Sequence, residues 1–314
     1  MIKAIPGAYP TMITPYNSDK TVDYGAVRAL TAWYYERGCA GVFASCQSSE
    51  IWYLGLEDRV KLAQTVKDES DRLASEYGRK LMVVASGHVS YDREEQVREL
   101  NLMAETGVDA VILISNRLNI ENTGDDDWIS DLSRLLPRLP DETALGVYEC
   151  PHPYKRLMND KLLSFCASTG RFAFMKDTCC DADLIAHRCE KLFGTGMSLF
   201  NANGQTLLTS LRDGAAGYCG VMCNFYPGLI SWLCRNFDTQ PMTAERVAAF
   251  LCLASFTEGL TYPASAKYYL AKYQGFDIST FSRSTDDRKL NRYARDCIDM
   301  MTISANELSD ELGL

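Results

Sequence analysis

The feature that most constrains the fold is a series of short apolar runs that alternate with longer amphipathic segments. The runs recur at intervals of roughly 30 residues, the length of a strand followed by a helix and its connections. We predict strands at 7–14, 41–45, 81–86, 110–114, 144–148, 172–176, 197–201 and 216–220. Eight strands that alternate with helices predict an α/β fold of the (β/α)8 class, the TIM barrel.

A doubly wound open sheet is the alternative fold with the same alternation of elements. Sheets of that kind often bind nucleotides through a glycine-rich turn after a strand. No G-x-G-x-x-G sequence follows the first predicted strand here, and no G-x-x-x-x-G-K-[S/T] sequence occurs. We therefore favour the barrel.

The pattern changes after Asn224, where helical periodicity continues without further strands. We predict helices there at 227–237, 244–256, 264–273 and 287–301. No Gly-, Ser- or Pro-rich linker separates them from the strands. We therefore expect a barrel at 1–224 and a C-terminal helical segment at 225–314 that packs on the barrel as an appendage.

Composition argues against several classes of function. The formal net charge of −9 at pH 7 does not suit non-specific binding to nucleic acid or to an anionic membrane. No apolar run approaches the roughly 20 residues of a membrane span. The N-terminal residues lack the apolar core of a secretory signal. We therefore expect a cytoplasmic protein.

The twelve cysteines are scattered through apolar runs, which is typical of small buried side chains in a reducing compartment. Cys219 and Cys223 are four residues apart, but no nearby histidine completes a zinc site. No cluster of His, Asp and Glu with ligand spacing stands at the predicted strand ends. We therefore expect no metal ion, and we disfavour a metal-dependent reaction.

One lysine stands where a barrel carries its chemistry, at the C-terminal end of a strand. The apolar run 172–175 leads directly into Lys176, and a lysine is rarely buried without a partner or a task. Burial disfavours the charged ammonium, and a neutral amine is a nucleophile that can form a Schiff base with a carbonyl compound. In the alternative interpretation, the strand ends and Lys176 emerges into solvent, paired with Asp177.

Other strand ends supply polar groups that could act with this lysine. Tyr148 ends the neighbouring strand, and its hydroxyl is a candidate proton shuttle. A core tyrosine with a backbone partner is the alternative interpretation. Ser48 and Ser49 follow the second strand, and their hydroxyls could hold a carboxylate. Further strand-end candidates for substrate binding are Gln47, Glu149 and Gly220.

The histidines are weaker candidates. His88 follows the third strand and could contact a substrate, although a structural role is favoured. His152 lies beyond the fifth strand and is either a substrate contact or a surface residue. His187 lies within a polar helical segment, so we predict it at the surface.

Five short motifs stand at the predicted strand ends. They are YPTMITP at 9–15, CQSSE at 46–50, YECP at 148–151, FMKD at 174–177, and GAAG at 214–217 followed by Asn224. In this order and at these positions, they resemble motifs of the dihydrodipicolinate synthase / N-acetylneuraminate lyase family of pyruvate-type class I aldolases and lyases. The resemblance covers essentially the whole chain.

The resemblance implies a mechanism in which Lys176 forms an imine with the keto group of pyruvate or another 2-oxo acid. Tyr148 would relay protons, and Ser48 and Ser49 would bind the carboxylate. The enamine on Lys176 would form or cleave a carbon–carbon bond, or dehydrate a sugar acid, with no separate cofactor. The resemblance also implies a homotetramer, with an aldehyde or a sugar acid as co-substrate.

The chain departs from the family pattern in two loops near the proposed nucleophile. Gln47 replaces the first hydroxyl-bearing residue of the second-strand loop, and Ser49 replaces its glycine. Leu118 stands where the synthases complete a hydroxyl relay with a tyrosine. These departures motivate a second hypothesis, a catalytically silent family member that binds a small oxo acid as a sensor.

Further departures concern the second substrate. Pro153 stands where the synthases carry an arginine, for which Lys155 or Arg156 could substitute. Gly204 and Gln205 stand where the neuraminate lyases carry an acidic pair. Neither named activity therefore carries over, and the sequence does not identify the second substrate.

A third hypothesis is a barrel isomerase that binds phosphate through glycine-rich loops after the seventh and eighth strands. Glycines are present there, at Gly204, Gly214, Gly217 and Gly220. Arg212 is the basic residue that accompanies them. We disfavour this hypothesis because a phosphate site normally offers more positive charge.

Overall fold

The computed structural model describes residues 2–314, which form a (β/α)8 barrel with further helices at the C-terminal end. The parallel strands neighbour one another in the order β1-β8-β7-β6-β5-β4-β3-β2. Their bounds are β1 Gly7–Pro10, β2 Gly41–Phe43, β3 Met82–Ala85, β4 Ala110–Ile114, β5 Leu145–Tyr148, β6 Phe172–Asp177, β7 Ser198–Asn201 and β8 Gly217–Gly220. All eight predicted strands are confirmed, with some ends shorter than predicted.

The two ends of the sheet meet between β1 and β2. Thr11 and Phe43 form a parallel bridge there, and Met12 N donates to Phe43 O at 3.0 Å. Ala40 N donates to Ala8 O at 3.0 Å on the same seam. These contacts close the sheet on itself, so the predicted barrel is confirmed and the open doubly wound sheet was the wrong alternative.

Aromatic side chains fill the inside of the barrel. The rings of Phe174 and Phe200 stack with their centroids 4.3 Å apart, and Tyr9 meets Phe200 edge-on at 4.7 Å. Gly41 leaves the space that Tyr9 occupies, since a Cβ atom at position 41 would lie 2.2 Å from the Tyr9 ring. The interior is therefore a packed core that closes the bottom of any site at the C-terminal face.

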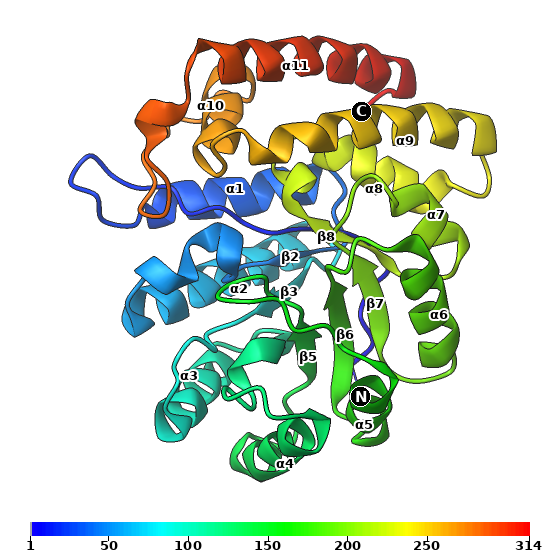
Figure 1. Cartoon of the computed structure of the whole chain (residues 1–314). Helices are drawn as coiled ribbons and strands as arrows, with labels where there is room; N and C mark the ends of the chain where they lie inside the picture. The colour runs from blue at the N-terminus through cyan, green and yellow to red at the C-terminus, as the bar shows by residue number, and fades with distance from the viewer. Residues whose placement is uncertain (1) are drawn as a thin grey trace.

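Helices cover the outside of the strands, as Figure 1 shows. Their bounds are α1 Tyr24–Glu36, α2 Leu56–Tyr77, α3 Arg93–Glu105, α4 Asp125–Leu135, α5 Asp160–Ser168, α6 Ala182–Leu192 and α7 Leu207–Arg212. Capping aspartates fix several of these helix starts. For example, Asp23 accepts from Ala26 N at 2.9 Å, and Asp92 accepts from Glu95 N at 3.0 Å.

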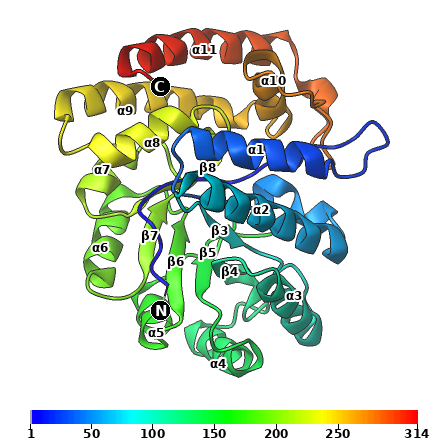
Figure 2. The same cartoon turned by 180° about the vertical axis from the view of Figure 1, so that it is seen from behind.

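In the described residues, four α-helices follow β8. They are α8 Pro227–Asn236, α9 Pro241–Ser255, α10 Ala264–Tyr273 and α11 Arg292–Leu312. The first of them, α8, contacts β1 and β8, as the eighth helix of a barrel does. Figures 1 and 2 show α9, α10 and α11 stacked beyond α1 and α8 on one side of the barrel. The division of the chain at residue 224 into two units stays a prediction.

The last helix was predicted at 287–301, and those bounds were wrong. Asn291 caps α11 by accepting from Ala294 N at 3.0 Å, so the helix begins later than predicted. It ends later as well, because buried Thr302 and Ala305 continue its inner face beyond Met301. Residues Asp287–Lys289 form only a short 3-10 turn.

A buried ion pair connects the loop after β2 to the C-terminal helices. The Glu50 carboxylate accepts from Ser282 Oγ at 2.6 Å and from Ser284 N at 2.7 Å. Lys267 Nζ of α10 lies 3.7 Å from the same carboxylate, and both side chains are fully buried. Burial lowers the pKa of Lys267 to about 8, although Glu50 opposes that shift. The loop after β2 is therefore anchored at Glu50 to α10 and to the segment that follows α10.

None of the helices in residues 2–314 is long and apolar enough to cross a lipid bilayer. The same residues hold no group of three or more His, Cys, Asp and Glu side chains placed to bind a metal ion.

Candidate active site

A cavity of about 470 Å³ opens at the C-terminal ends of the strands, and we call it the Lys176 cavity. Its walls come from the β2 loop, from the ends of β5 to β8, and from the segment after α9. Five predicted site residues line it, namely Gln47, Ser48, Tyr148, Lys176 and Gly220. The barrel thus brings together residues that are up to 173 positions apart, from 47 to 220.

Lys176 is held inside this cavity. It stands next to Tyr148 in the register of β5 and β6, and only 6% of the residue is exposed. Its Nζ lies 4.2 Å from the centroid of the Tyr148 ring and 5.7 Å from that of Phe43. The alternative of a solvent-exposed lysine paired with Asp177 is wrong, because Asp177 is buried and pairs with Arg188 instead.

Tyr148 presents its hydroxyl to the cavity. The hydroxyl donates to Gln47 Oε1 at 3.4 Å, and Cys150 Sγ donates to the same oxygen at 3.2 Å. Burial raises the pKa of Tyr148 well above its ordinary value, so the phenol keeps its proton at neutral pH. A protonated phenol beside an amine can donate a proton to an oxygen that forms or leaves at the neighbouring carbon.

The two serines of the β2 loop have different places. Ser48 lines the cavity, and its Oγ donates to Thr11 Oγ1 at 3.1 Å. Ser49 does not line it, because its Oγ lies 2.6 Å from Met12 O and 2.9 Å from Ala44 O and accepts from Cys46 N. Ser49 therefore stabilises the loop, and the structure does not support its predicted contact with a substrate.

Glu149 also turns away from the cavity, against its prediction as a substrate contact. Glu149 directly follows Tyr148, the last residue of β5, and its side chain lies on the side of Arg188, outside the barrel. Glu149 accepts from Met158 N at 2.6 Å and Thr178 N at 3.0 Å, and it pairs with Arg188 at 2.8 Å. Burial raises the pKa of Glu149 to about 6, and Arg188 opposes the rise.

Arg188 of α6 is a buried residue that sequence reasoning missed. It pairs with both Glu149 and Asp177, which directly follow Tyr148 and Lys176. This ion-pair triad fixes the ends of β5 and β6 from outside the barrel. It thereby positions the two side chains that face each other within the Lys176 cavity.

Histidines contribute little to the site. His88 is buried away from the cavity, where its Nδ1 accepts from Ile114 N at 3.1 Å. Burial lowers the pKa of His88 to about 4, so it is a neutral structural residue. His187 is exposed and lies 2.9 Å from Asp160, as its predicted surface position requires. Only His152 lines the cavity, with its ring 4.9 Å from that of Trp52.

The two basic residues weighed for the second substrate separate in the structure. Lys155 lines the cavity, and its Nζ donates to Thr178 O at 2.6 Å. Arg156 lies outside the cavity wall and pairs with Asp125 at 3.3 Å. Lys155 is therefore the basic residue that a second substrate could meet.

The segment after α9 supplies cavity residues that sequence reasoning missed. They include Glu258, Tyr262, Ser284 and Thr285. Glu258 is the only carboxylate among residues 2–314 that lines the cavity. The one local signal for it was a lone acidic residue within Phe256–Gly259, a short turn between two helices.

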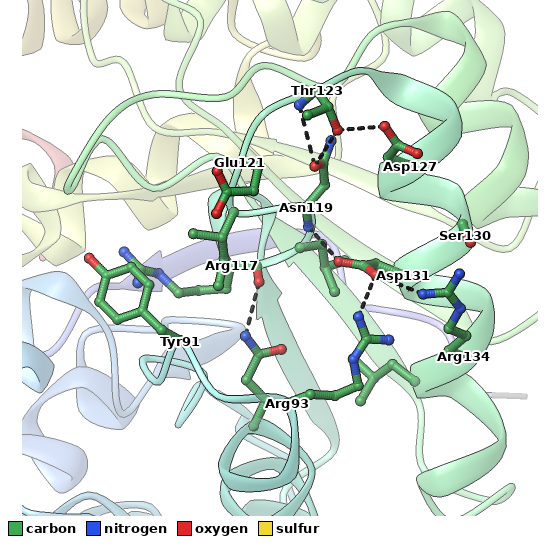
Figure 3. Close-up of a pocket in the computed structure, with 14 residues that line it drawn as sticks. Tyr91, Arg93, Arg117, Asn119, Glu121, Thr123, Asp127, Ser130, Asp131 and Arg134 are labelled. Carbon is green, nitrogen blue, oxygen red and sulfur yellow. Dashed lines mark hydrogen bonds and ion pairs between the residues drawn. The ribbon is translucent and has the colours of Figure 1, made fainter.

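A second cavity, of about 400 Å³, lies beside α3 and α4, and Leu118 is part of its wall. Figure 3 shows Arg93 and Arg134 both directed at Asp131 in this cavity. Asp131 also accepts from Asn119 N at 2.8 Å. The described lining of this cavity holds as many acidic residues as arginines, and it holds no strand-end nucleophile. We therefore assign the chemistry to the Lys176 cavity.

The fold and the site define a class of protein, a (β/α)8 barrel with a lysine and a tyrosine side by side at the C-terminal face. Comparison with known proteins narrows the class. No family model matches the chain. A curated relative, the 4-hydroxy-tetrahydrodipicolinate synthase of Bifidobacterium longum, is 24% identical over 276 residues, which covers 87% of this chain and 86% of the relative.

Solved structures have the same fold along their whole length. The sialic acid aldolase of Ruminococcus gnavus matches with a TM-score of 0.83 and 16% identity, over 98% of this chain and 99% of that one. A prophage protein of the dihydrodipicolinic acid synthase family from E. coli K12, in complex with pyruvate, matches with a TM-score of 0.83 and 16% identity, over 96% and 98%. These comparisons agree with the resemblance of the chain to the dihydrodipicolinate synthase / N-acetylneuraminate lyase family, since the matched proteins include a synthase and an aldolase with those names.

Proposed function

We propose that the protein is a Schiff-base lyase or aldolase that acts on pyruvate or a related 2-oxo acid through an imine on Lys176. The observation that carries this proposal is the pairing of a buried Lys176 with a protonated Tyr148 in one cavity. The pyruvate complex of a protein with the same fold supports the choice of substrate class.

The first step of the proposed reaction is formation of the imine. The amine of Lys176, once its ammonium form has lost a proton, attacks the keto carbon, and a proton then passes from the nitrogen to the carbonyl oxygen to give a carbinolamine. Tyr148 donates a proton to the hydroxyl group, which leaves as water while the nitrogen lone pair forms the C=N bond. The Ser48 hydroxyl and the Gln47 amide line the same cavity and would hold the carboxylate of the substrate.

The second step uses the enamine. Loss of a proton from C3 of the imine moves an electron pair into a C2=C3 bond and neutralises the nitrogen. The enamine carbon can then attack an aldehyde, and the reverse sequence cleaves the same carbon–carbon bond. Expulsion of a hydroxyl group from C4 by the same electron pair would dehydrate a sugar acid. Lys176 supplies the electron sink, so the protein needs no separate cofactor for this chemistry.

Borohydride trapping tests the proposal. We would incubate the protein with pyruvate, reduce the mixture, and map the adduct by peptide mass. A covalent adduct on Lys176 that is absent from Lys176→Ala is the expected result. Absence of an adduct with pyruvate and with a panel of longer 2-oxo acids would overturn the lyase. Binding of those acids without an adduct would then favour a silent 2-oxo-acid sensor.

The phosphate-binding isomerase gains no support from the geometry. Arg212, the basic residue that accompanied the glycines, lies at the end of α7 and pairs with Glu245 at 3.0 Å on the exposed surface. It is not part of the Lys176 cavity wall.

We also propose a homotetramer, and this rests on the family resemblance. Light scattering on the purified protein is the test. A mass near four times 35.1 kDa is expected, and a monomer at micromolar concentration would contradict it.

A further inference from the structure

One acidic side chain in the Lys176 cavity has no role in imine formation as described above. Glu258 comes from the short turn Phe256–Gly259, called η6, directly after α9. Its side chain lines the cavity, yet its Oε1 is buried and has no hydrogen-bond partner among residues 2–314. A buried carboxylate oxygen without a partner costs stability, so its retention at a cavity wall calls for a ligand or a reaction.

The packing of α9 determines where this carboxylate lies. Gly204 follows β7, and a Cβ atom at that position would lie 2.1 Å from Ser255 Oγ. The absence of a side chain at Gly204 therefore lets the C-terminal end of α9 approach the β7 loop. Ser255 Oγ donates to Leu251 O at 2.8 Å and stays within its own helix. Glu258 follows three residues later and enters the cavity beside β7 and β8.

Glu258 interacts electrostatically with one cation and two phenols. Lys176 of β6 is the cation whose charge acts on it, and the phenols are Tyr218 of β8 and Tyr262 of the segment after η6. Burial raises the pKa of both tyrosines, so they stay neutral. Burial also raises the pKa of Glu258 to about 7, and the charge of Lys176 opposes that rise. Glu258 can therefore both accept and release a proton near neutral pH.

The order of the strands places Lys176 between two proton-transfer groups. Tyr148 comes from β5, on one side of β6, and Glu258 reaches the cavity from beside β7 and β8, on the other side. Tyr148 therefore lies beside the Lys176 amine, where the carbinolamine of the proposed reaction would form. Glu258 is the only carboxylate in the described lining and is available for a second proton transfer in the same cavity.

We propose that Glu258 transfers the proton of the hydroxyl group at the carbon that the enamine attacks, and that the second substrate is a hydroxylated aldehyde. This inference rests on the proposed Schiff-base function. In cleavage, Glu258 accepts the hydroxyl proton and the O–H electron pair forms the C=O bond of the aldehyde. The carbon–carbon bond breaks, its electron pair forms the C=C bond of the enamine, and the C=N pair returns to nitrogen. In the reverse reaction, the aldol addition, Glu258 donates that proton back to the aldehyde oxygen.

The chemistry of the same wall fits this class of second substrate. Neutral polar groups line the same cavity as Glu258, among them Asn203, Tyr262, Ser284 and Thr285. Such groups hydrogen-bond to the hydroxyls of a sugar-like aldehyde. A carboxylate at Glu258 repels a second carboxylate, so a negatively charged group of the aldehyde is disfavoured next to Glu258 and would have to bind at Lys155, the basic residue of the same lining.

The test separates imine formation from the step at Glu258. Three readouts are measured on the full-length protein, namely borohydride trapping of pyruvate, exchange of the pyruvate methyl protons in D2O, and aldol addition of pyruvate to glycolaldehyde, glyceraldehyde and erythrose. Glu258→Gln should keep trapping and exchange but lose aldol addition by about 10²–10⁴-fold. The wild-type rate of addition should change near pH 7, and this dependence should be absent from the variant. Glu307→Gln removes an exposed carboxylate from α11 and serves as the matched control.

Every other outcome of the experiment contradicts a defined part of the inference. Equal aldol rates in Glu258→Gln and wild type would overturn the role of Glu258 and leave the Schiff-base function untouched. Loss of trapping or exchange in the variant would assign Glu258 to the imine or enamine step and overturn the hydroxyl role. A wild-type protein that traps pyruvate but adds to none of the three aldehydes would overturn the substrate class. Failure of wild-type trapping would overturn the Schiff-base function itself.

Discussion

Ser255 of α9 lies so close to Gly204 that a single methyl group on Gly204 would be 2.1 Å from Ser255 Oγ and 3.4 Å from Ser255 Cβ. We therefore predict that Gly204→Ala destabilises the protein by about 1–3 kcal/mol through overpacking. The variant should also slow aldol addition, since η6 and Glu258 move with the end of α9. Ser255→Ala removes the closest atom, so the double variant Gly204→Ala/Ser255→Ala should recover most of both losses.

Urea unfolding of the two single variants and the double variant measures this coupling as a double-mutant cycle. Additive effects would mean that the two residues do not interact, and they would contradict the placement of Glu258 by this contact.

We predict that the Glu258 carboxylate lowers the free energy of unfolding near pH 7, where it would act in the proposed reaction. Its pKa is about 7 in the folded protein and 4.5 ordinarily. The folded state therefore binds the proton more tightly, and this residue lowers stability as the pH rises from 4.5 to 7. Glu258→Gln should stabilise the protein by at most about 3 kcal/mol at pH 8, less any solvent screening through the open cavity, and by almost nothing at pH 4.

Thermal unfolding of Glu258→Gln and wild type at both pH values provides the measurement. A variant that is less stable than wild type at pH 8 would show that the carboxylate has a partner that stabilises it.

Arg188 balances two buried carboxylates behind the site. Removal of the cation in Arg188→Met leaves Glu149 and Asp177 buried without a counter-ion, which should cost about 3–5 kcal/mol at pH 8. The loss should be smaller at pH 5, because carboxylates without a cation become protonated more easily. Trapping of pyruvate should slow as well, since Tyr148 and Lys176 lose the support of the residues that follow them.

Arg246→Met is the control for this prediction. It breaks the pair of Arg246 with Glu311, in which both side chains are about half exposed, and should cost no more than about 1 kcal/mol. Equal losses in the two arginine variants would contradict a special role for the buried triad.

Tyr148→Phe should keep the ring below Lys176 and remove only the proton donor. We expect imine formation with pyruvate to slow by about 10²–10⁴-fold, with thermal stability close to wild type. The rate of borohydride-trapped adduct formation is the measurement, and Tyr77→Phe, at an exposed tyrosine of α2, is the control. A wild-type rate in Tyr148→Phe would assign the proton relay to another group.

The sequence predicted the barrel because its strands are buried on both faces and so appear as continuous apolar runs. Lys176 and Tyr148 could be placed at strand ends for the same reason. Ser49 and Glu149 could not be placed correctly, since the backbone beyond a strand end decides which of two adjacent residues faces the cavity. Ser49 faces the barrel backbone, and Glu149 faces Arg188.

The place of Glu258 in the site could not be predicted from the sequence for a different reason. Its position depends on contact between α9 and the β7 loop, which are separated by about fifty residues in the chain and meet only after folding. The bounds of α11 failed for a simpler reason, because the Asn291 cap was not recognised and the inner face continued past Met301.

The wall of the Lys176 cavity combines two sources. Lys176 and Tyr148 stand on barrel strands, whereas Glu258, Tyr262, Ser284 and Thr285 come from residues that follow α9. Under the proposed mechanism, mutations after α9 should alter the choice of aldehyde while Lys176 and Tyr148 keep their places. A protein built in this way would be readily diversified, in nature or by directed evolution, through randomisation of a few positions after α9.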